Sequence, residues 1–144
     1  MIVLDANVLL YAYHEGVPQH ARARAWVESA FSGSEPVALP WQSVTAFLRI
    51  ATHRKVFTNP FTVAEAVGIV RSWFGAPAVG SIEPGERYWD IFSGLMERSQ
   101  VDGPLVMDAS LAAIAIEVGA TLATSDRDFR RFDGLKLIDP LQEG

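Results

Sequence analysis

The chain has 144 residues, no cysteine and a formal charge of −5 at pH 7. Its length fits one domain, and a hydrophobic fraction of 49% with 20% charged residues excludes a disordered or low-complexity protein. Without cysteine, disulfides, zinc–thiolate sites, iron–sulfur clusters and thiol catalysis are excluded, so any metal must bind to oxygen or imidazole. The acidic balance argues against wrapping nucleic acid by charge alone, but a local nucleic-acid site is still compatible with it.

The amino-terminal residues carry no basic segment and meet a carboxylate at Asp5, and the longer uncharged stretches are short or contain proline. Neither a signal peptide nor a spanning helix is therefore expected. We expect a cytoplasmic protein that forms a single domain over residues 1–144.

Apolar periodicity and turn residues predict alternating strands and helices along the whole chain. The predicted elements are a strand at 2–4, a helix at 18–31, a strand at 37–39, helices at 40–52 and 63–74, a strand at 78–82, a helix from 84, a helix at 107–118, and strands at 121–124 and 135–138. A polar turn is predicted at 5–7, before a second apolar run at 8–12. Thr62 and Glu65 stand at capping-box spacing.

Strands that alternate with helices predict an α/β fold with a mostly parallel sheet of four to five short strands and helices on both faces. In such a sheet, ligands bind beyond the carboxyl ends of the strands. The residues directly after each predicted strand are therefore the first candidates for a functional site.

Carboxylates follow two of these strands. Asp5 ends the first strand, Asp126 and Asp128 follow the strand at 121–124, and Asp108 lies in the first turn of the helix before that strand. Like charges that meet at one edge repel one another unless a cation compensates them. Ligation by oxygen alone suits Mg²⁺ or Mn²⁺.

Each acid also has a purely structural explanation. Asp108 is placed where a carboxylate gains from the helix dipole, and Asp128 completes a capping-box pattern with Ser125. Asp5 is harder to explain this way, because a carboxylate directly after an apolar strand is costly to bury without a partner. Their coincidence at one sheet edge favours a metal site.

Three segments, 4–10, 107–113 and 123–129, together with the trailing residues 134–140, resemble the PIN-domain ribonucleases and most closely the VapC toxins of bacterial toxin–antitoxin pairs. The resemblance covers nearly the whole chain and implies a PIN-like fold. It also implies an endoribonuclease that depends on Mg²⁺ or Mn²⁺ held by Asp5, Asp108 and Asp126. Its implied partners are an RNA substrate, a small VapB-like antitoxin and a second copy of the chain.

One departure from the family pattern concerns the helix at 40–52. Ala46 stands where the family usually has a glutamate, and Gln42 lies one turn earlier on the same face. Gln42 could hold a metal-bound water, cap the helix or face solvent. Asn7 and Thr124, together with Asp128, are further candidates for the surroundings of the metal.

The missing acid keeps a second hypothesis open, in which the protein is a non-catalytic or weakly catalytic RNA-binding or interaction module. A phosphoacceptor signalling domain ranks last, because the middle strands are followed by no acid. Candidate phosphate contacts are Arg49, 53–55, Arg127, Arg130 and Arg131, although scattered surface arginines are also normal. The aromatic helices around Trp73, Trp89 and Phe92 favour a homodimer and a groove for an antitoxin helix.

Overall fold

A computed structural model describes residues 1–57 and 59–142 of the protein. Its elements in chain order are β1 (Ile2–Leu4), α1 (Ala6–Tyr13), α2 (His20–Phe31), β2 (Val37–Pro40), α3 (Trp41–Ala51), α4 (Val63–Phe74), β3 (Val79–Ile82), α5 (Tyr88–Ser99), α6 (Leu105–Glu117), β4 (Thr121–Ala123), the 3₁₀ helix η1 (Arg127–Arg131) and β5 (Lys136–Ile138). The predicted α/β class is confirmed.

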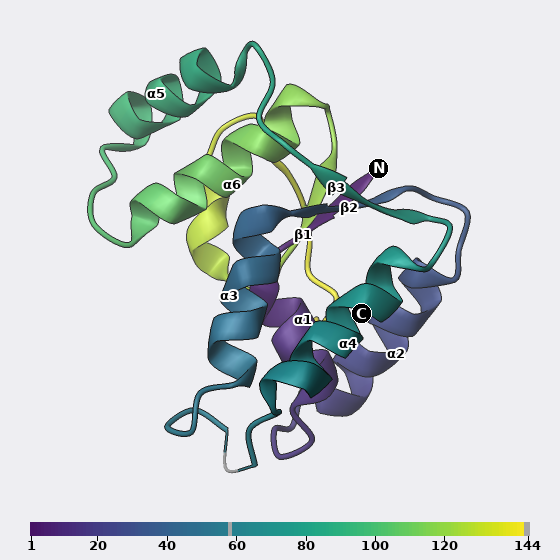
Figure 1. The fold of residues 1–144 in the computed structure, drawn as a ribbon. Coiled ribbons are helices and arrows are strands. Elements are labelled where there is room, and N and C mark those ends of the chain that lie inside the picture. Colours follow the sequence, from purple (N-terminus) through teal and green to yellow (C-terminus); the bar gives the residue numbers. More distant parts are fainter. Residues whose placement is uncertain (58, 143–144) are drawn as a thin grey trace.

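All five strands described are parallel and form one sheet in the order β3-β2-β1-β4-β5. The first strand is central and pairs Ile2 with Val37 on one side and with Thr121 on the other. This order reverses at β1, so the chain leaves β1 and β4 at neighbouring positions of the same sheet edge. Figure 1 shows the strands between the two groups of helices.

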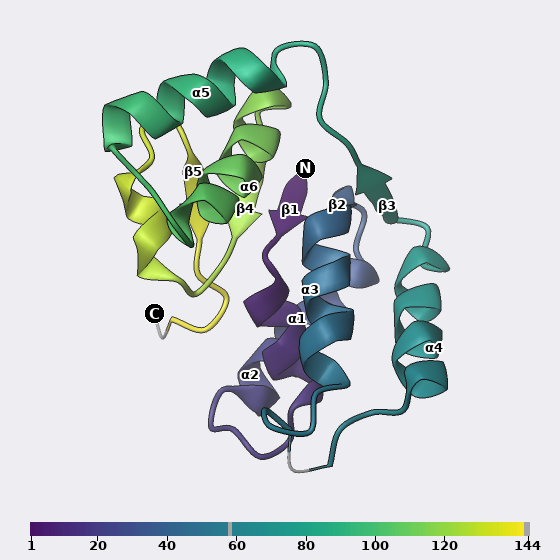
Figure 2. The ribbon, with the colours of Figure 1, turned by 60° about the vertical axis from the view of Figure 1, so that its left-hand side comes forward.

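Alternating side chains of the strands divide the core between the two faces of the sheet. Leu4 and Leu39 pack into one cluster with the helices α1 to α4, where the aromatic side chains of Phe47 and Trp73 are fully buried. Val3 and Leu122 point to the other face and pack against α5 and α6. Figure 2 shows the two groups of helices apart from one another.

Alanine dominates the buried side of α6, at Ala109, Ala112, Ala113 and Ala115. Such small side chains let the helix backbone approach the sheet closely. Gly119, with a φ of 67°, ends the helix in the left-handed conformation that glycine adopts without strain, as its position in the sequence predicts. The helix therefore lies close to the sheet, and only a short turn separates its end from the start of β4.

One predicted turn is wrong. Residues 5–7 do not form a turn between two apolar runs, because Asp5 is the N-cap of α1 and the helix continues through the second run to Tyr13. The apolar run at 8–12 packs on the sheet as a helix face, with Val8, Leu9 and Ala12 buried. A short apolar run does not distinguish strand from helix by periodicity, and the cap residue was the available signal.

Other boundaries differ by a few residues. The α2 helix begins at His20 rather than at residue 18, and α5 begins at Tyr88 rather than at 84. Before α5, the backbone N–H groups of Gly85 and Arg87 donate hydrogen bonds to the Glu117 carboxylate. The capping box of Thr62 and Glu65 on α4 is confirmed in both directions. None of the described helices is both long and apolar enough to cross a membrane.

Candidate functional site

Three elements bring carboxylates to the edge where β1 and β4 end. Asp5 follows β1 directly, Asp126 follows β4 by three residues, and Asp108 lies in the first turn of α6. The buried hydroxyl of Ser43 on α3 donates to the Leu4 carbonyl at 2.7 Å, which fixes the end of β1 against that helix. The parallel strands and the short connections between elements therefore place these acids together, as the sequence predicts.

A buried threonine hydroxyl connects the two strand ends. Thr124, only 4% exposed, donates to Asp5 Oδ2 at 2.8 Å and accepts from the backbone N–H of Asp126 at 3.0 Å. The amide nitrogen of Asn7 approaches the same hydroxyl at 3.4 Å. Asp5 Oδ1 accepts from the backbone N–H of Ala6 at 2.8 Å. Both oxygens of Asp5 thus have donors, and its orientation is fixed.

The closest group of carboxylates is made by Asp108, Asp126 and Asp128, which each offer an oxygen within 4.8 Å of the others. Asp5 is the neighbour of this group but is not part of it. The structure therefore brings Asp128, for which the sequence left a cap, a ligand and a place in the surroundings of the metal open, within 4.8 Å of Asp108 and Asp126. The sequence predicts Asp5 as a metal ligand and counts Asp128 among the candidate surrounding residues. In the structure Asp128, and not Asp5, belongs to the closest group of carboxylates.

Electrostatic strain is concentrated on Asp108. Its pKa is raised to about 6, first by burial and then by the charges of Asp126, Asp5 and Asp128. The pKa of Asp5 is also raised, mainly by burial, while its hydrogen bonds from Thr124 and Ala6 oppose that rise. A carboxylate among carboxylates is the arrangement that a bound cation would relieve.

The predicted capping role of Asp128 is wrong. Asp126 is the N-cap of η1, and its Oδ1 accepts from the backbone N–H of Asp128 at 2.9 Å. The side chain of Asp128 instead lies 3.5 Å from an Arg131 nitrogen, an exposed ion pair of small energetic weight. Ser125 forms no capping box, because the helix starts one residue later than that pattern requires.

Gln42 joins two helices at the site. Its amide nitrogen donates to the Met107 carbonyl at 3.2 Å, and its amide oxygen accepts from the Ser110 hydroxyl at 3.3 Å. The Ser110 hydroxyl is also 2.6 Å from the Tyr88 hydroxyl. Gln42 therefore does not cap its own helix, and its partly exposed amide is held by two hydrogen bonds. It holds the first turn of α6, which carries Asp108, against α3.

Sequence reasoning missed Ser110 and Tyr88 as parts of this connection. The available signal was a serine within the otherwise apolar run of α6, where an unpaired hydroxyl would be costly. Ala46 lies one turn beyond Gln42 on the same face of α3 and brings no carboxylate to the cluster. The acids at the site thus come from β1, α6 and the segment after β4.

The donor set fits a hard divalent cation. Three carboxylates within reach of one another provide oxygen ligands, which suit Mg²⁺ or Mn²⁺ better than a thiophilic metal. A second observation points the same way: the side-chain oxygen of Asn7 is buried and has no hydrogen-bond donor among the described residues. A water held by a cation is one donor that would satisfy this oxygen.

The three histidines lie away from this cluster. His20 contacts the Tyr11 carbonyl at 2.9 Å, His53 accepts from the backbone N–H of Lys55 at 3.0 Å, and His14 stacks on Phe57 at 4.2 Å between ring centres. None of them provides an imidazole pair for acid–base chemistry at the sheet edge. The chemistry available at the site is therefore that of carboxylates and of whatever they bind.

Comparison with known proteins is consistent across sequence and structure. The sequence model of the PIN domain family matches residues 2–135. Ribonuclease VapC33 of Mycobacterium tuberculosis is 41% identical over 143 residues, which cover 99% of this chain and 100% of that protein. Ribonuclease VapC43 of the same organism is 38% identical over 141 residues, covering 98% of this chain and 96% of that protein.

Among solved structures, VapBC2 from Rickettsia felis bound to a promoter DNA fragment has a chain that superimposes with a TM-score of 0.69. The match covers 96% of this chain and 98% of that chain at 17% sequence identity. At that identity the likeness concerns the fold alone.

Proposed function

The chain belongs to the PIN domain family and, within it, to the VapC ribonucleases, and from this premise we propose that it is a metal-dependent endoribonuclease. In this proposal it acts as the toxin of a type II toxin–antitoxin pair and works as a single PIN-like domain over residues 1–144. The observation that carries the proposal is the group of Asp108, Asp126 and Asp128, whose oxygens lie within 4.8 Å of one another.

We assign the cation to Mg²⁺ or Mn²⁺ and its ligands to Asp108 and Asp126, with Asp128 or Asp5 completing the set. When bound, such a cation lowers the pKa of a coordinated water and neutralises negative charge on a phosphate group. Thr124 holds the carboxylate of Asp5 and the backbone of Asp126 in place, so the strand ends keep a fixed separation. Asn7 presents its free oxygen from the first turn of α1.

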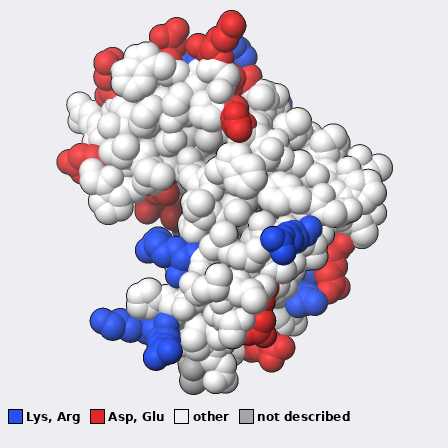
Figure 3. Space-filling model, viewed as in Figure 1, with Lys and Arg blue, Asp and Glu red and all other residues white. Residues whose placement is uncertain are grey.

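The surface around the carboxylates supports an RNA substrate. Acidic side chains lie in a recess of the surface shown in Figure 3, and lysine or arginine side chains adjoin that recess. Cations next to the carboxylates would position phosphates that the acids alone would repel. Selectivity among RNAs would then depend on the shape of single-stranded segments.

Product ends provide the test. Because no histidine lies at the cluster, we expect a water-derived oxygen rather than the ribose 2′-hydroxyl to attack the phosphate. Purified protein incubated with total RNA and Mn²⁺ should therefore produce fragments with a 5′-phosphate and a 3′-hydroxyl, mapped by sequencing of fragment ends. A chelator should abolish these ends. Fragments with 2′,3′-cyclic phosphates, or cleavage that survives the chelator, would contradict the mechanism.

The alternative of an RNA-binding module without cleavage rests on Ala46, which leaves α3 without an acid. The same incubation separates the two hypotheses. Retained RNA binding with no metal-dependent cleavage favours the module, whereas cleavage that requires the metal favours the nuclease. An Ala46→Glu variant sharpens the comparison, since an added carboxylate on this face would strengthen a cation site and raise metal affinity.

A VapB-like antitoxin is the partner that the relatives suggest, since VapBC2 is a two-protein assembly by name. An apolar cavity of about 490 Å³ between α3 and α4 would accept the apolar anchors of an amphipathic antitoxin helix. Its lining includes Trp41, Leu48, Val67, Val70 and Phe74. Co-purification with the antitoxin that is lost in Leu48→Asp, while the variant keeps its thermal stability, would support this position.

The aromatic residues predicted to form a homodimer contact differ in their exposure to solvent. Trp73 is 2% exposed and belongs to the core, so it cannot form a groove, whereas Trp89 on α5 is 66% exposed. We keep the homodimer as a proposal and assign its contact to α5. Light scattering across a wide concentration range tests it, with Trp89→Ala expected to shift the protein toward monomer.

A further inference from the structure

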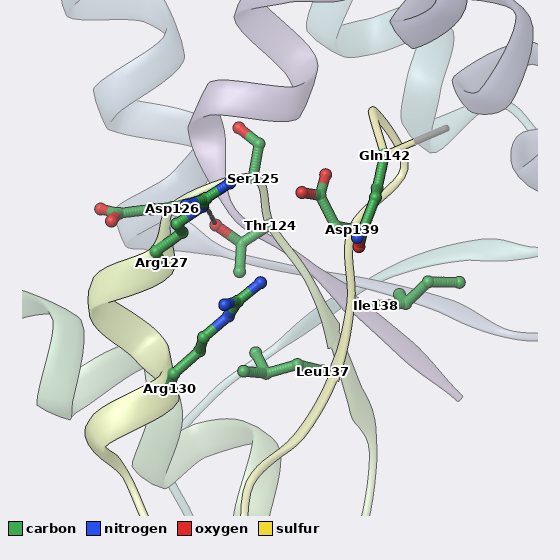
Figure 4. A pocket seen from close by; sticks show the side chains of 9 residues that line it. All are labelled: Thr124, Ser125, Asp126, Arg127, Arg130, Leu137, Ile138, Asp139 and Gln142. Carbon is green, nitrogen blue, oxygen red and sulfur yellow. Dashed lines mark hydrogen bonds between the residues drawn. The ribbon is translucent and has the colours of Figure 1, made fainter. Parts of the chain in front are cut away.

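A cavity of about 240 Å³ lies beyond the carboxyl ends of β4 and β5, directly beside the carboxylates. It shares Thr124 and Asp126 with the candidate site. The remaining lining residues are Ser125, Arg127, Arg130, Leu137, Ile138, Asp139 and Gln142, and all are drawn in Figure 4. This position makes the cavity a continuation of the site rather than a separate pocket.

Two guanidinium groups in the cavity have no partner in the part of the chain that the structure describes. Within residues 1–57 and 59–142, the guanidinium of neither Arg127 nor Arg130 forms a hydrogen bond or an ion pair. Their neighbour Arg131 differs, because its guanidinium contacts the backbone carbonyl and the carboxylate of Asp128. In Figure 4 the Arg130 guanidinium lies between Thr124 and Leu137. Planar guanidinium groups with unused donors match the oxygens of a phosphate.

The opposite wall comes from the edge strand β5, which pairs with β4 alone. Leu137 is 38% exposed there, an apolar side chain turned toward Arg130 in Figure 4. Asp139 uses one oxygen to accept from the backbone N–H of Leu141, and Figure 4 shows its carboxylate directed toward Ser125. Apolar surface and a guanidinium plane accept the face of a nucleobase, and a carboxylate accepts from base amino groups.

We propose that this cavity binds the nucleotide adjacent to the scissile phosphate of a single-stranded RNA. Arg127 and Arg130 bind the phosphate of this nucleotide, while Leu137 and Asp139 contact its base. The cavity is smaller than the roughly 300–1,000 Å³ of pockets that enclose drug-sized ligands, which restricts it to about one nucleotide. This inference rests on the proposed ribonuclease function, because it deepens the substrate site of that activity.

An RNA explains the arrangement better than a protein partner does. Because Asp126 belongs both to the carboxylate cluster and to the cavity wall, a strand with one phosphate at the cluster has its neighbouring nucleotide within reach of the two arginines. The chain carries a net charge of −5, so binding of a polyanion requires local groups of free cations such as this one.

Binding without cleavage tests the phosphate contact. The probe is a fluorescein-labelled, ten-nucleotide RNA of random sequence in EDTA, and anisotropy gives Kd over a series of KCl concentrations. Arg127→Ala/Arg130→Ala should weaken binding at least about tenfold and reduce the slope of log K against log salt by about 0.7, the value for one single-strand phosphate contact. Arg127→Lys/Arg130→Lys should keep the slope but lose part of the affinity.

The matched control is Arg98→Ala/Lys136→Ala, which removes the same two positive charges at exposed positions outside the cavity. Its Kd should stay within about twofold of the wild type, with an unchanged salt slope. Equal losses in the control and the cavity variant would overturn the proposal in favour of a general charge effect. No measurable binding by the wild-type protein at low salt would overturn it as well.

The base contact has its own readout. Fragment ends produced by the wild type should show a preferred base at one position next to the cleavage site, and Asp139→Asn should change that preference. A wild-type pattern with no preference at any flanking position would overturn the base contact.

The two proposals fail separately. RNA binding that depends on Arg127 and Arg130, in a protein that never cleaves RNA, would support the cavity while refuting the nuclease. Metal-dependent cleavage that is unchanged in the Arg127→Ala/Arg130→Ala variant would support the nuclease while refuting the role of the cavity. If the Arg127→Ala/Arg130→Ala variant binds RNA normally but no longer co-purifies with the antitoxin, the two arginines contact the protein partner and the proposal is overturned.

Discussion

Asp5 and Asp108 stand at the same edge of the sheet but in opposite surroundings. Both oxygens of Asp5 accept hydrogen bonds, from Thr124 and from the backbone N–H of Ala6. Asp108 has no such donors among the described residues, and its pKa is raised first by burial and then by three other carboxylates. A carboxylate with satisfied oxygens can serve as a scaffold in the metal-free protein. A buried carboxylate without donors is stabilised by a bound cation or by protonation.

The largest effect is expected on RNA cleavage when the charge of Asp108 is removed. Asp108→Asn keeps the size of the side chain but removes a charge, so we expect RNA cleavage to fall by at least about a hundredfold while the metal-free fold is retained or stabilised. The matched control is Asp90→Asn, because Asp90 also lies in the first turn of a helix, α5. Cleavage rates of both folded variants with Mn²⁺ check this. Equal rates for wild type and Asp108→Asn would refute the role of Asp108 as a ligand.

Metal binding should stabilise the protein through the same residues. At a free Mn²⁺ concentration near one hundred times Kd, the free energy of unfolding should rise by about 2.7 kcal/mol, because the cation binds the folded state alone. We expect weak affinity, since Ala46 brings no ligand. Thermal unfolding at matched ionic strength measures the effect. An equal rise in Asp108→Asn/Asp126→Asn would place the bound metal elsewhere.

Thr124→Val tests the hydrogen bonds that hold Asp5 and Asp126 in place rather than the carboxylates themselves. The change keeps the shape but removes the donor to Asp5 and the acceptor for the Asp126 N–H, so we expect a loss of about 1–3 kcal/mol in the free energy of unfolding. Urea unfolding measures it. Thr45→Val is the control, because the exposed Thr45 hydroxyl contacts only carbonyls of its own helix among the described residues, and its cost should stay within about 0.5 kcal/mol. Similar losses in both variants would contradict the scaffold role.

The smallest effect is a dependence of metal-free stability on pH. The pKa of Asp108 is raised from 3.8 to about 6 in the folded protein, so the folded state binds the proton more tightly than the unfolded chain does. Stability is therefore greatest below pH 3.8 for this group and falls as pH rises through about 6. Solvent screening of the half-exposed carboxyl reduces the expected loss to about 1–2 kcal/mol.

Urea unfolding at pH values between 4 and 7 in EDTA checks this dependence. Asp108→Asn should flatten the fall, although Asp5 contributes a part in the same direction because its pKa is raised too. Added Mn²⁺ should also flatten it, since a bound cation favours the ionised carboxylates. Stability that rises over this pH range in the wild type and not in Asp108→Asn would contradict the sign of the shift.

The sequence by itself determined the alternation of strands and helices, the parallel sheet and the edge at which the acids gather. These features follow from local patterns: the apolar runs, the capping box of Thr62 and Glu65, and the glycine after α6. The turn at 5–7 failed because five apolar residues fit a strand or a helix equally well, and Asp5 as the N-cap decides for the helix.

Only the tertiary structure decided which carboxylates meet and what each of them contacts. Asp128 joins Asp108 and Asp126 because the cap of η1 forms at Asp126, and Asp5 is held by Thr124, which follows β4 and lies 119 positions further along the sequence. The pairing of Gln42 with Ser110 likewise depends on how the fold places α3 next to the first turns of α6. Distances of this kind arise from the closeness of elements in space, which no spacing along the chain encodes.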